Sequence, residues 1–167
     1  MHLFCNFEAF KRVMRKLIPV SLTVILSGLI LLILSCTPQS CFEETSALLK
    51  ATFYKAGSNV PNIADTLTVY GIGNDSLLYD KSLNVSTIKL PLDASSRNCG
   101  FVIRINEITD TLIFTYSSYP HLISKECGIT FFYTLESYSV SGTKIDTIIF
   151  RNNKITNLNE ENIRIFY

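Results

Sequence analysis

The feature that most constrains the fold is an alternation of apolar and polar residues, which recurs from residue 49 to residue 167. A period of two places every second side chain on one face, as in strands buried on one side only. The alternating segments are 49–54, 66–70, 88–92, 99–106, 111–116, 126–140, 144–150 and 162–167. None of the chain in this region keeps the 3.6-residue period of an amphipathic helix. The pattern therefore predicts an all-β domain.

Turn-forming clusters such as Gly57-Ser58-Asn59 and Ser141-Gly142 separate the segments. About seven to nine short strands between residues 47 and 167 predict an antiparallel β-sandwich of immunoglobulin-like type, with a small β-barrel as the alternative. Because the chain has no tryptophan, the core of a true immunoglobulin domain is not indicated.

A different pattern occupies the N-terminal segment. Four basic residues, Lys11, Arg12, Arg15 and Lys16, precede an apolar stretch from Leu17 to Ser35. Basic residues, an apolar stretch and then a small residue are typical of a secretory signal, which forms an apolar helix. The translation start is either Met1 or Met14, because both precede the apolar stretch.

The end of this stretch, Ile33-Leu34-Ser35-Cys36, resembles the lipobox of bacterial lipoproteins. The resemblance implies cleavage before Cys36, a diacylglyceryl thioether on its sulfur and acylation of the new amino terminus. Several acyl chains hold a protein at a membrane, whereas one chain alone binds marginally. We therefore expect a signal peptide over 1–35, a lipid-anchored tether over 36–46 and a folded domain over 47–167.

The alternative is an uncleaved transmembrane anchor, since Leu17 to Ser35 spans 19 residues and is long enough to cross a bilayer. The polar and helix-breaking residues within it, and the cysteine at its end, favour the lipoprotein. Both interpretations place residues 42–167 outside the cytoplasm.

Charge excludes one class of partner. From Cys36 onward the chain has eleven basic and thirteen acidic residues, a net charge of −2. A protein that binds nucleic acid relies on a concentration of positive charge. We therefore expect no nucleic-acid partner.

Three cysteines remain once Cys5 is removed with the leader and Cys36 is acylated: Cys41, Cys99 and Cys127. An exported compartment permits disulfides, and an odd number leaves one thiol over. Cys99 and Cys127 fall on expected inward faces. Our first choice is Cys41–Cys127, which would pin the tether to the domain, and our second is Cys99–Cys127. No CxxC motif or histidine pair suggests zinc, and we expect no metal or other cofactor.

Aspartate followed by threonine or serine and an apolar residue recurs along the chain, and two interpretations stand. An aspartate that caps a turn before a β-branched strand explains the motif structurally. The motif also resembles the O-glycosylation acceptor of secreted Bacteroidetes proteins, which would make Thr66, Ser76, Thr111 and Thr147 acceptors. Calcium bound by Asp65, Asp110 and Asp146 is disfavoured, because the dense ligand spacing of calcium loops is missing.

Sequence motifs do not indicate an enzyme. The one histidine after the leader, His121, adjoins Pro120 and is expected in an exposed loop. A Cys127–His121 nucleophile pair would need an exposed thiolate, whereas the alternation turns Cys127 inward. Aromatic residues on the opposite strand faces form either a partner-binding patch or cross-strand pairs: Tyr54, Tyr70, Phe132, Tyr138 and Phe166.

The chain from Cys36 to Tyr167 resembles small, uncharacterised Bacteroidales lipoproteins that carry a domain of unknown function. The resemblance rests on Cys36, Cys41 and the stretches "LKATFY", "DTLTVYGIGNDSLLYD", "LISKECGITFFYTLESY" and "IDTIIFRNNKIT". It implies a cell-envelope lipoprotein with a β-rich domain, in which Cys41 and Cys127 recur. In many surface lipoproteins of this phylum an acidic export signal follows the acylated cysteine. Here that signal is weak, because Glu43 and Glu44 lie well after Cys36, which favours an outer-membrane protein that faces the periplasm.

We expect a non-enzymatic envelope module that binds a protein partner or serves a structural role. The alternative is a lipoprotein that binds glycan or another small ligand in nutrient capture. Exposed aromatic residues beside a groove would favour glycan, whereas a flat apolar patch or an open edge strand would favour a protein.

Overall fold

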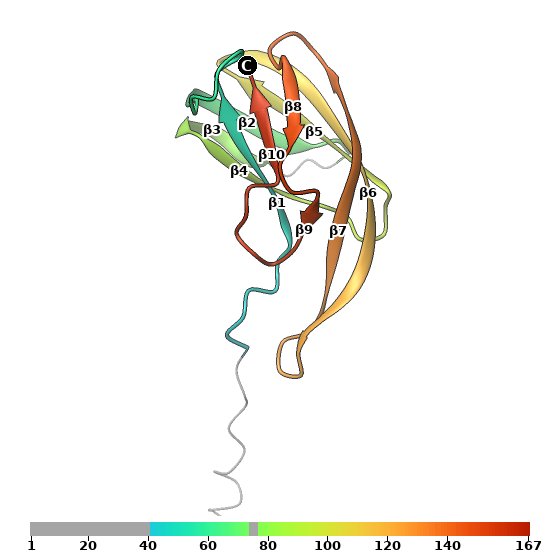
Figure 1. Cartoon of the computed structure of the whole chain (residues 1–167). Coiled ribbons are helices and arrows are strands. Elements are labelled where there is room, and N and C mark those ends of the chain that lie inside the picture. The colour runs from blue at the N-terminus through green and yellow to red at the C-terminus, as the bar shows by residue number, and fades with distance from the viewer. Residues whose placement is uncertain (1–40, 74–76) are drawn as a thin grey trace, which may run out of the picture. The chain divides into compact units, whose positions relative to one another are not determined.

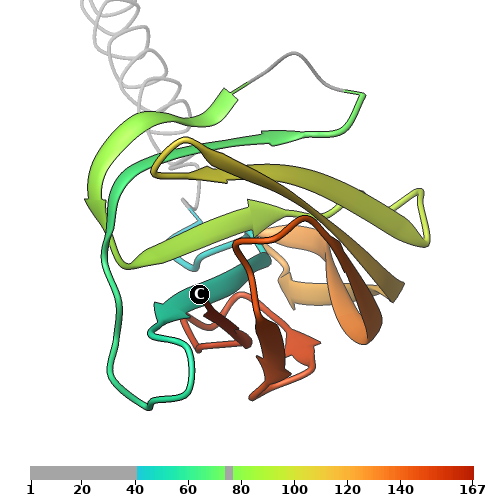
Figure 2. The same ribbon diagram turned by 90° about the horizontal axis from the view of Figure 1, so that it is seen from above.

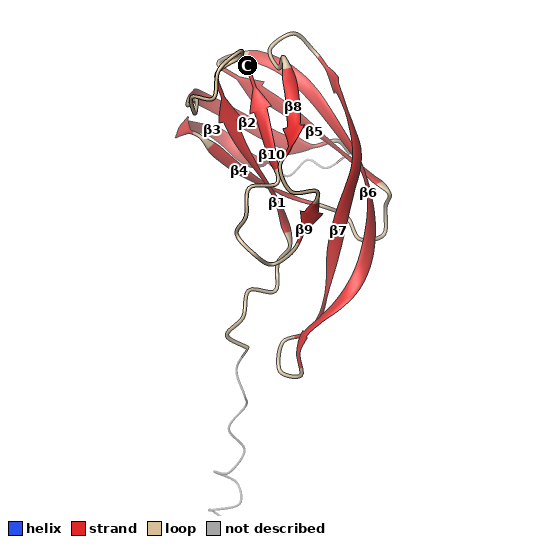
Figure 3. Ribbon diagram, in the orientation of Figure 1, coloured by secondary structure: helices blue, strands red, loops and turns tan. Residues whose placement is uncertain are grey.

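A computed structural model describes residues 41–73 and 77–167. The predicted leader, with its helix and Cys36, and the candidate acceptor Ser76 lie outside the described residues. The regular secondary structure that is described consists of strands (Figure 3). Among these residues no helix has the length and apolar character needed to span a membrane.

The strands form two sheets (Figure 1). The smaller has the order β4-β1-β10-β8 and the larger the order β3-β2-β5-β6-β7-β9. Their bounds are β1 Leu48–Tyr54, β2 Ala64–Gly71, β3 Leu77–Val85, β4 Thr87–Pro91, β5 Asn98–Ile105, β6 Ile108–Ser124, β7 Gly128–Ser141, β8 Thr147–Phe150, β9 Lys154–Ile155 and β10 Ile163–Phe166.

The all-β prediction is confirmed, and two of its details were wrong. The first and last strands, β1 and β10, pair in parallel, with Ala51 opposite Ile163. Parallel neighbours need a long connection, and here almost the whole domain supplies it. Strands β3 and β9 had not been predicted. The structure has ten described strands, against the seven to nine predicted, and one parallel pair. The immunoglobulin-like arrangement is therefore not confirmed.

The two sheets face each other across one hydrophobic core (Figure 2). Alternate residues of β1, β5 and β6 are fully buried, as the alternation predicted: Leu49, Ala51 and Phe53, then Phe101, Ile103 and Ile105, then Leu112, Phe114 and Tyr116. Two tyrosine hydroxyls tie the loop after β4 to the larger sheet. Tyr133 donates to Leu92 O at 2.9 Å, and Tyr116 donates to Asp93 O at 2.9 Å.

Two buried polar side chains organise turns far away in the sequence. Both carboxylate oxygens of Asp110 accept backbone N–H groups, from Thr143 at 3.0 Å, Lys144 at 2.9 Å and Ile145 at 2.6 Å. Asn162 accepts from Lys50 N at 2.9 Å and donates to Lys154 O at 3.0 Å. We had expected Asp110 to cap its own turn. It instead caps the turn after β7.

The longest hairpin, β6–β7, extends well beyond the rest of the domain (Figure 1). Its outer part, residues 119–132, is called the arm below. Beyond Thr115, β6 has no β5 partner, so Pro120 lies in a strand with a free edge, where proline is tolerated. The strand therefore continues through Pro120 and His121, where a loop was predicted.

The structure also corrects the predicted inward face of residues 126–140. Tyr133 and Leu135 are buried as expected, whereas Ile129 and Phe131 are exposed. Cys127 is not in the core, because it lies in the turn before β7. The arm extends beyond the smaller sheet (Figure 1), and no described residue buries this face there.

Candidate functional site

The segment 41–46, which leads into β1, is fixed to the arm by a disulfide. Cys41 is bonded to Cys127 in the hairpin turn, 86 residues away, with their Cα atoms 4.8 Å apart. This is the pair that was our first choice from the sequence, ahead of Cys99–Cys127. Thr130 Oγ1 donates to Thr45 O at 2.6 Å and Asn157 Nδ2 to Glu44 O at 3.0 Å, which holds the segment beside β7.

The arm has one exposed apolar face. Pro120 pairs with Phe131, and Leu122 pairs with Ile129. Since alternate residues share a face, these four side chains continue the face that carries the buried Tyr133. Leu122, Ile129 and Phe131 are 58%, 68% and 42% exposed, and Phe42, next to the disulfide, is 92% exposed. Large apolar side chains are therefore concentrated at the end of the domain where the tether enters.

Aromatic side chains cover the other face of the arm. The ring of His121 stacks on Phe132 at a centroid distance of 4.3 Å, and Tyr119 meets Phe132 edge-on at 6.1 Å. His121 thus shields an aromatic neighbour, and Cys127 has no thiolate to pair with it because its sulfur is in the disulfide. The Cys127–His121 nucleophile pair, which the sequence disfavours, is therefore not formed in this structure.

A polar groove of about 300 Å³ lies beside the segment 41–46. Its lining residues come from three stretches of the chain: Glu44, Ser46, Leu48, Lys50, Lys89, Thr156, Asn157, Leu158 and Asn159. Two hydrogen bonds from Ser46, with a contribution from the charge of Lys89, hold the pKa of Glu44 below its usual range. No sequence motif indicates this groove, because only the tertiary fold brings Lys50 and Lys89 together.

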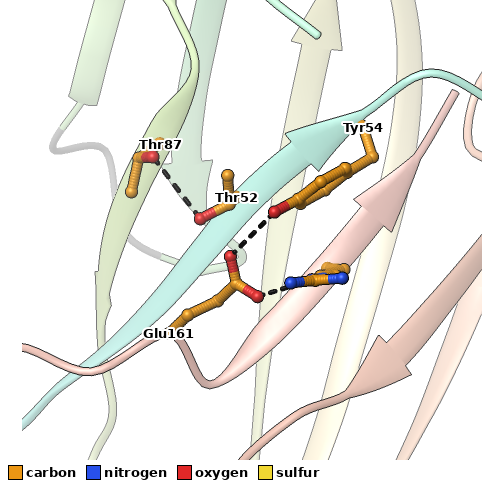
Figure 4. A network of polar contacts seen from close by, with 5 residues as sticks. Thr52, Tyr54, Thr87 and Glu161 are labelled. Atoms are coloured by element: carbon orange, nitrogen blue, oxygen red, sulfur yellow. Dashed lines mark hydrogen bonds and ion pairs between the residues drawn. The ribbon is translucent and has the colours of Figure 1, made fainter. Parts of the chain in front are cut away.

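A second polar cluster lies on β4, β1 and β10 (Figure 4). Arg164 Nε donates to Glu161 Oε1 at 2.6 Å, and the Tyr54 hydroxyl donates to the other oxygen at 3.3 Å. The Arg164 guanidinium also lies 4.6 Å from the centre of the Tyr54 ring. The glutamate raises the pKa of Arg164. Each charge has its partner within the cluster, which marks it as structural.

The five aromatic residues noted in the sequence do not form one patch. Tyr54 is paired with Phe166 on neighbouring strands, Tyr138 contacts Phe150, and Phe132 lies in the arm. The interpretation as cross-strand pairs fits Tyr54 with Phe166 and Phe132 with Tyr119, whereas Tyr138 and Phe150 meet across the two sheets. A different apolar patch, which the sequence analysis missed, lies on the outer face of the larger sheet.

This patch, called the outer patch, crosses β3, β2, β5 and β6. Ile72 lies over Gly100, Gly100 is paired with Ile113, and Tyr70 is paired with Leu77 and Val102. Ile72, Leu77 and Ile113 are exposed. A side chain at position 100 would collide with Ile72, so the glycine is what allows Ile72 to lie flat on the sheet.

The described candidate O-glycosylation residues differ in access. Thr66 and Thr111 are half-buried within β2 and β6, and each of these strands has a neighbour on both sides. Thr147 is exposed at the start of β8, an edge strand. Asp65 and Asp146 are exposed and Asp110 is buried and saturated with backbone donors, so the three do not form one cation site.

Cys99 is the free thiol among the described residues and is half-buried on β5. Burial, with a smaller effect from the charge of Asp93, raises the pKa of its thiol. A thiol that stays protonated is a poor nucleophile, which disfavours Cys99 as a reactive centre.

Fold and site together define a class: an all-β domain of two sheets whose entry segment is fixed by a disulfide to a protruding hairpin. The family described as "Family of unknown function (DUF6452)" matches residues 66–167 of this chain. The chain therefore belongs to that family. Neither the curated proteins nor the solved structures contain a match.

Proposed function

We propose that this chain is a cell-envelope lipoprotein, anchored through Cys36 and working as a non-enzymatic module that binds an envelope protein or serves a structural role. The outer membrane, with the domain facing the periplasm, is the proposed location. Within this proposal residues 1–35 are a signal peptide, 36–46 a tether and 47–167 an immunoglobulin-like domain.

One observation carries the proposal: the disulfide between Cys41 and Cys127. Stable disulfides form in oxidising compartments and are rare in the cytosol of most organisms. The bond thus supports export independently of the lipobox motif. It also joins the residues just after the proposed anchor to the domain, as a tethered module requires.

Two surfaces bear on what the module binds. The outer patch is a flat apolar surface on a sheet, the kind of surface that favours a protein partner. The polar groove favours glycan less, because none of its described lining residues is an aromatic on which a sugar would stack. The glycan- or small-ligand-binding alternative therefore rests on the groove's polar groups alone.

O-glycosylation is proposed as a secondary feature. Thr147 is the best placed of the described candidate acceptors, because an enzyme can reach an exposed residue at the start of an edge strand. Glycopeptide mapping of the natural protein tests this. Glycan on Thr111 but not on Thr147 would contradict the ranking.

The anchor is tested by intact-mass analysis of the protein purified from membranes. We expect an N-terminus at Cys36 that carries acyl chains, and loss of both the acyl mass and the membrane association in a Cys36→Ala variant. A bare Cys36 thiol with the leader still attached would refute the lipoprotein assignment.

The partner is tested by crosslinking in intact cells, followed by purification of the protein. One stoichiometric envelope protein is expected, and its recovery should fall when Ile113→Lys places a charge in the outer patch. An Ile149→Lys variant, on β8 of the other sheet and similarly exposed, is the matched control. Recovery of glycan alone would favour the alternative.

A further inference from the structure

The end of the domain that carries the disulfide exposes several large apolar side chains. Phe42, Leu122, Ile129 and Phe131 project there without a described neighbour that buries them. The only charged residues between positions 117 and 131 are Lys125 and Glu126, which are of opposite sign. The arm therefore has an apolar surface with no net charge.

Covalent geometry limits how far this surface lies from the proposed lipid anchor, on which the inference rests. Five residue steps separate Cys36 from Cys41, and an extended chain covers at most about 18 Å in that number. Cys41 is bonded to the hairpin turn through Cys127. The acylated residue and the tip of the arm are thus confined to the same short distance.

That distance is about two to three times the thickness of the headgroup region, so the tip of the arm can reach this region while the acyl chains stay in the bilayer. The polar headgroup region on each side of the hydrocarbon core is roughly 5–8 Å thick. When the tip is held within reach of this region, its exposed apolar side chains can leave water for the boundary of headgroups and acyl chains, where their free energy is lower. Apolar residues enter the boundary of headgroups and acyl chains by about 5–10 Å.

We propose that the arm is a membrane-contact surface. In the anchored protein Phe42, Leu122, Ile129 and Phe131 lie against the lipid headgroups of the membrane that holds the acyl chains. The disulfide keeps the tip there, and the outer patch, on another part of the domain, stays free for a protein. Because the arm has no net charge, apolar contact rather than attraction to anionic lipid drives this association.

Tryptophan fluorescence tests the proposal, since the chain has no tryptophan of its own. The full mature lipoprotein with Ile129→Trp is reconstituted into vesicles of phosphatidylcholine with brominated acyl chains. The matched control is Leu83→Trp on β3, whose native side chain is 70% exposed against 68% for Ile129. We expect brominated lipid to quench the tryptophan at position 129 about threefold more than the one at position 83.

Further measurements separate the possible outcomes. Leu122→Trp, on the opposite strand of the arm, should repeat the quenching, and 0.5 M salt should leave it unchanged. Adding Cys127→Ser to Ile129→Trp should reduce it, because the tip is then released from the tether. Equal quenching at positions 129 and 83 in a preparation shown by mass to be acylated would overturn the membrane contact and leave the lipoprotein assignment intact.

Two other results would also overturn the inference. A preparation from membranes without acyl chains would remove its premise and refute the proposed function with it. A photoreactive residue at position 129 that crosslinks to one envelope protein in cells, and not to lipid, would reassign the arm as a protein-binding surface.

Discussion

Replacing Asp110 is predicted to destabilise the domain more than replacing Asp65 or Asp146, the aspartates that begin the similar motifs. Its buried carboxylate accepts hydrogen bonds from three successive backbone N–H groups, those of Thr143, Lys144 and Ile145. A hydrogen bond to a charged group contributes about 1.5–3 kcal/mol, although three that share one carboxylate do not add fully. We expect Asp110→Asn to cost about 2–3 kcal/mol, because its amide places a donor against a backbone donor.

The loss is measurable by thermal unfolding followed by circular dichroism. For a domain of this size each kcal/mol shifts Tm by roughly 3–5 °C, so Asp110→Asn should lower Tm by about 10 °C. Asp65→Asn is the matched control, because Asp65 begins the same Asp-Thr-Leu motif and is exposed, with Asn106 Nδ2 donating to it at 3.2 Å. Equal melting of the two variants would refute the idea that this carboxylate organises the turn.

Three further predictions follow from buried groups. Asn162→Ala should cost about 2–4 kcal/mol in urea unfolding, because it leaves Lys50 N–H and two carbonyls unpaired, whereas exposed Asn153→Ala should be near neutral. Burial raises the pKa of Tyr116 from 10.0 to about 12, so the native state holds this proton more tightly than the unfolded state. The stability this contributes is complete below pH 10 and is lost as pH rises through 12, and Tyr116→Phe should flatten that decline in alkaline unfolding. Cys99 should react with a maleimide far more slowly than the thiol of Cys41 in a Cys127→Ser variant, because Cys99 is half-buried and its pKa is raised.

The strands could be predicted from the alternation along the chain. Their inward residues could be predicted wherever the other sheet lies opposite the strand. On β5 the inward residues Phe101, Ile103 and Ile105 were assigned correctly, because period-two patterning depends on neighbours along the chain alone. The parallel partner of β1 was not predictable. It depends on how the chain ends meet, which no local pattern encodes.

The arm shows where the alternation stops being informative. Ile129, Phe131, Tyr133 and Leu135 do share one face, as the pattern predicted, yet only the latter two are buried. Alternation gives the face of a residue and not whether another sheet lies opposite it. Burial on this face ends where the smaller sheet ends, and the apolar residues beyond that point were therefore misread as core.

The groove and the Glu161–Arg164 cluster were missed for a different reason. Most of their members are polar or charged residues that look like ordinary exposed positions of separate strands and loops. Only the pairing of β4, β1 and β10 brings them together. The disulfide was accessible from the sequence because cysteines are few and their pairing choices can be enumerated.

The family match begins at residue 66, whereas the folded unit begins earlier. Strand β1 lies between β4 and β10 and contributes Leu49, Ala51 and Phe53 to the core. Without it, β4 and β10 would each lose a hydrogen-bonding neighbour, and the core would lose three fully buried side chains. A fragment that starts at residue 66 therefore lacks the centre of one sheet. It also lacks Cys41, so that any role of the arm that depends on the tether belongs to the longer unit.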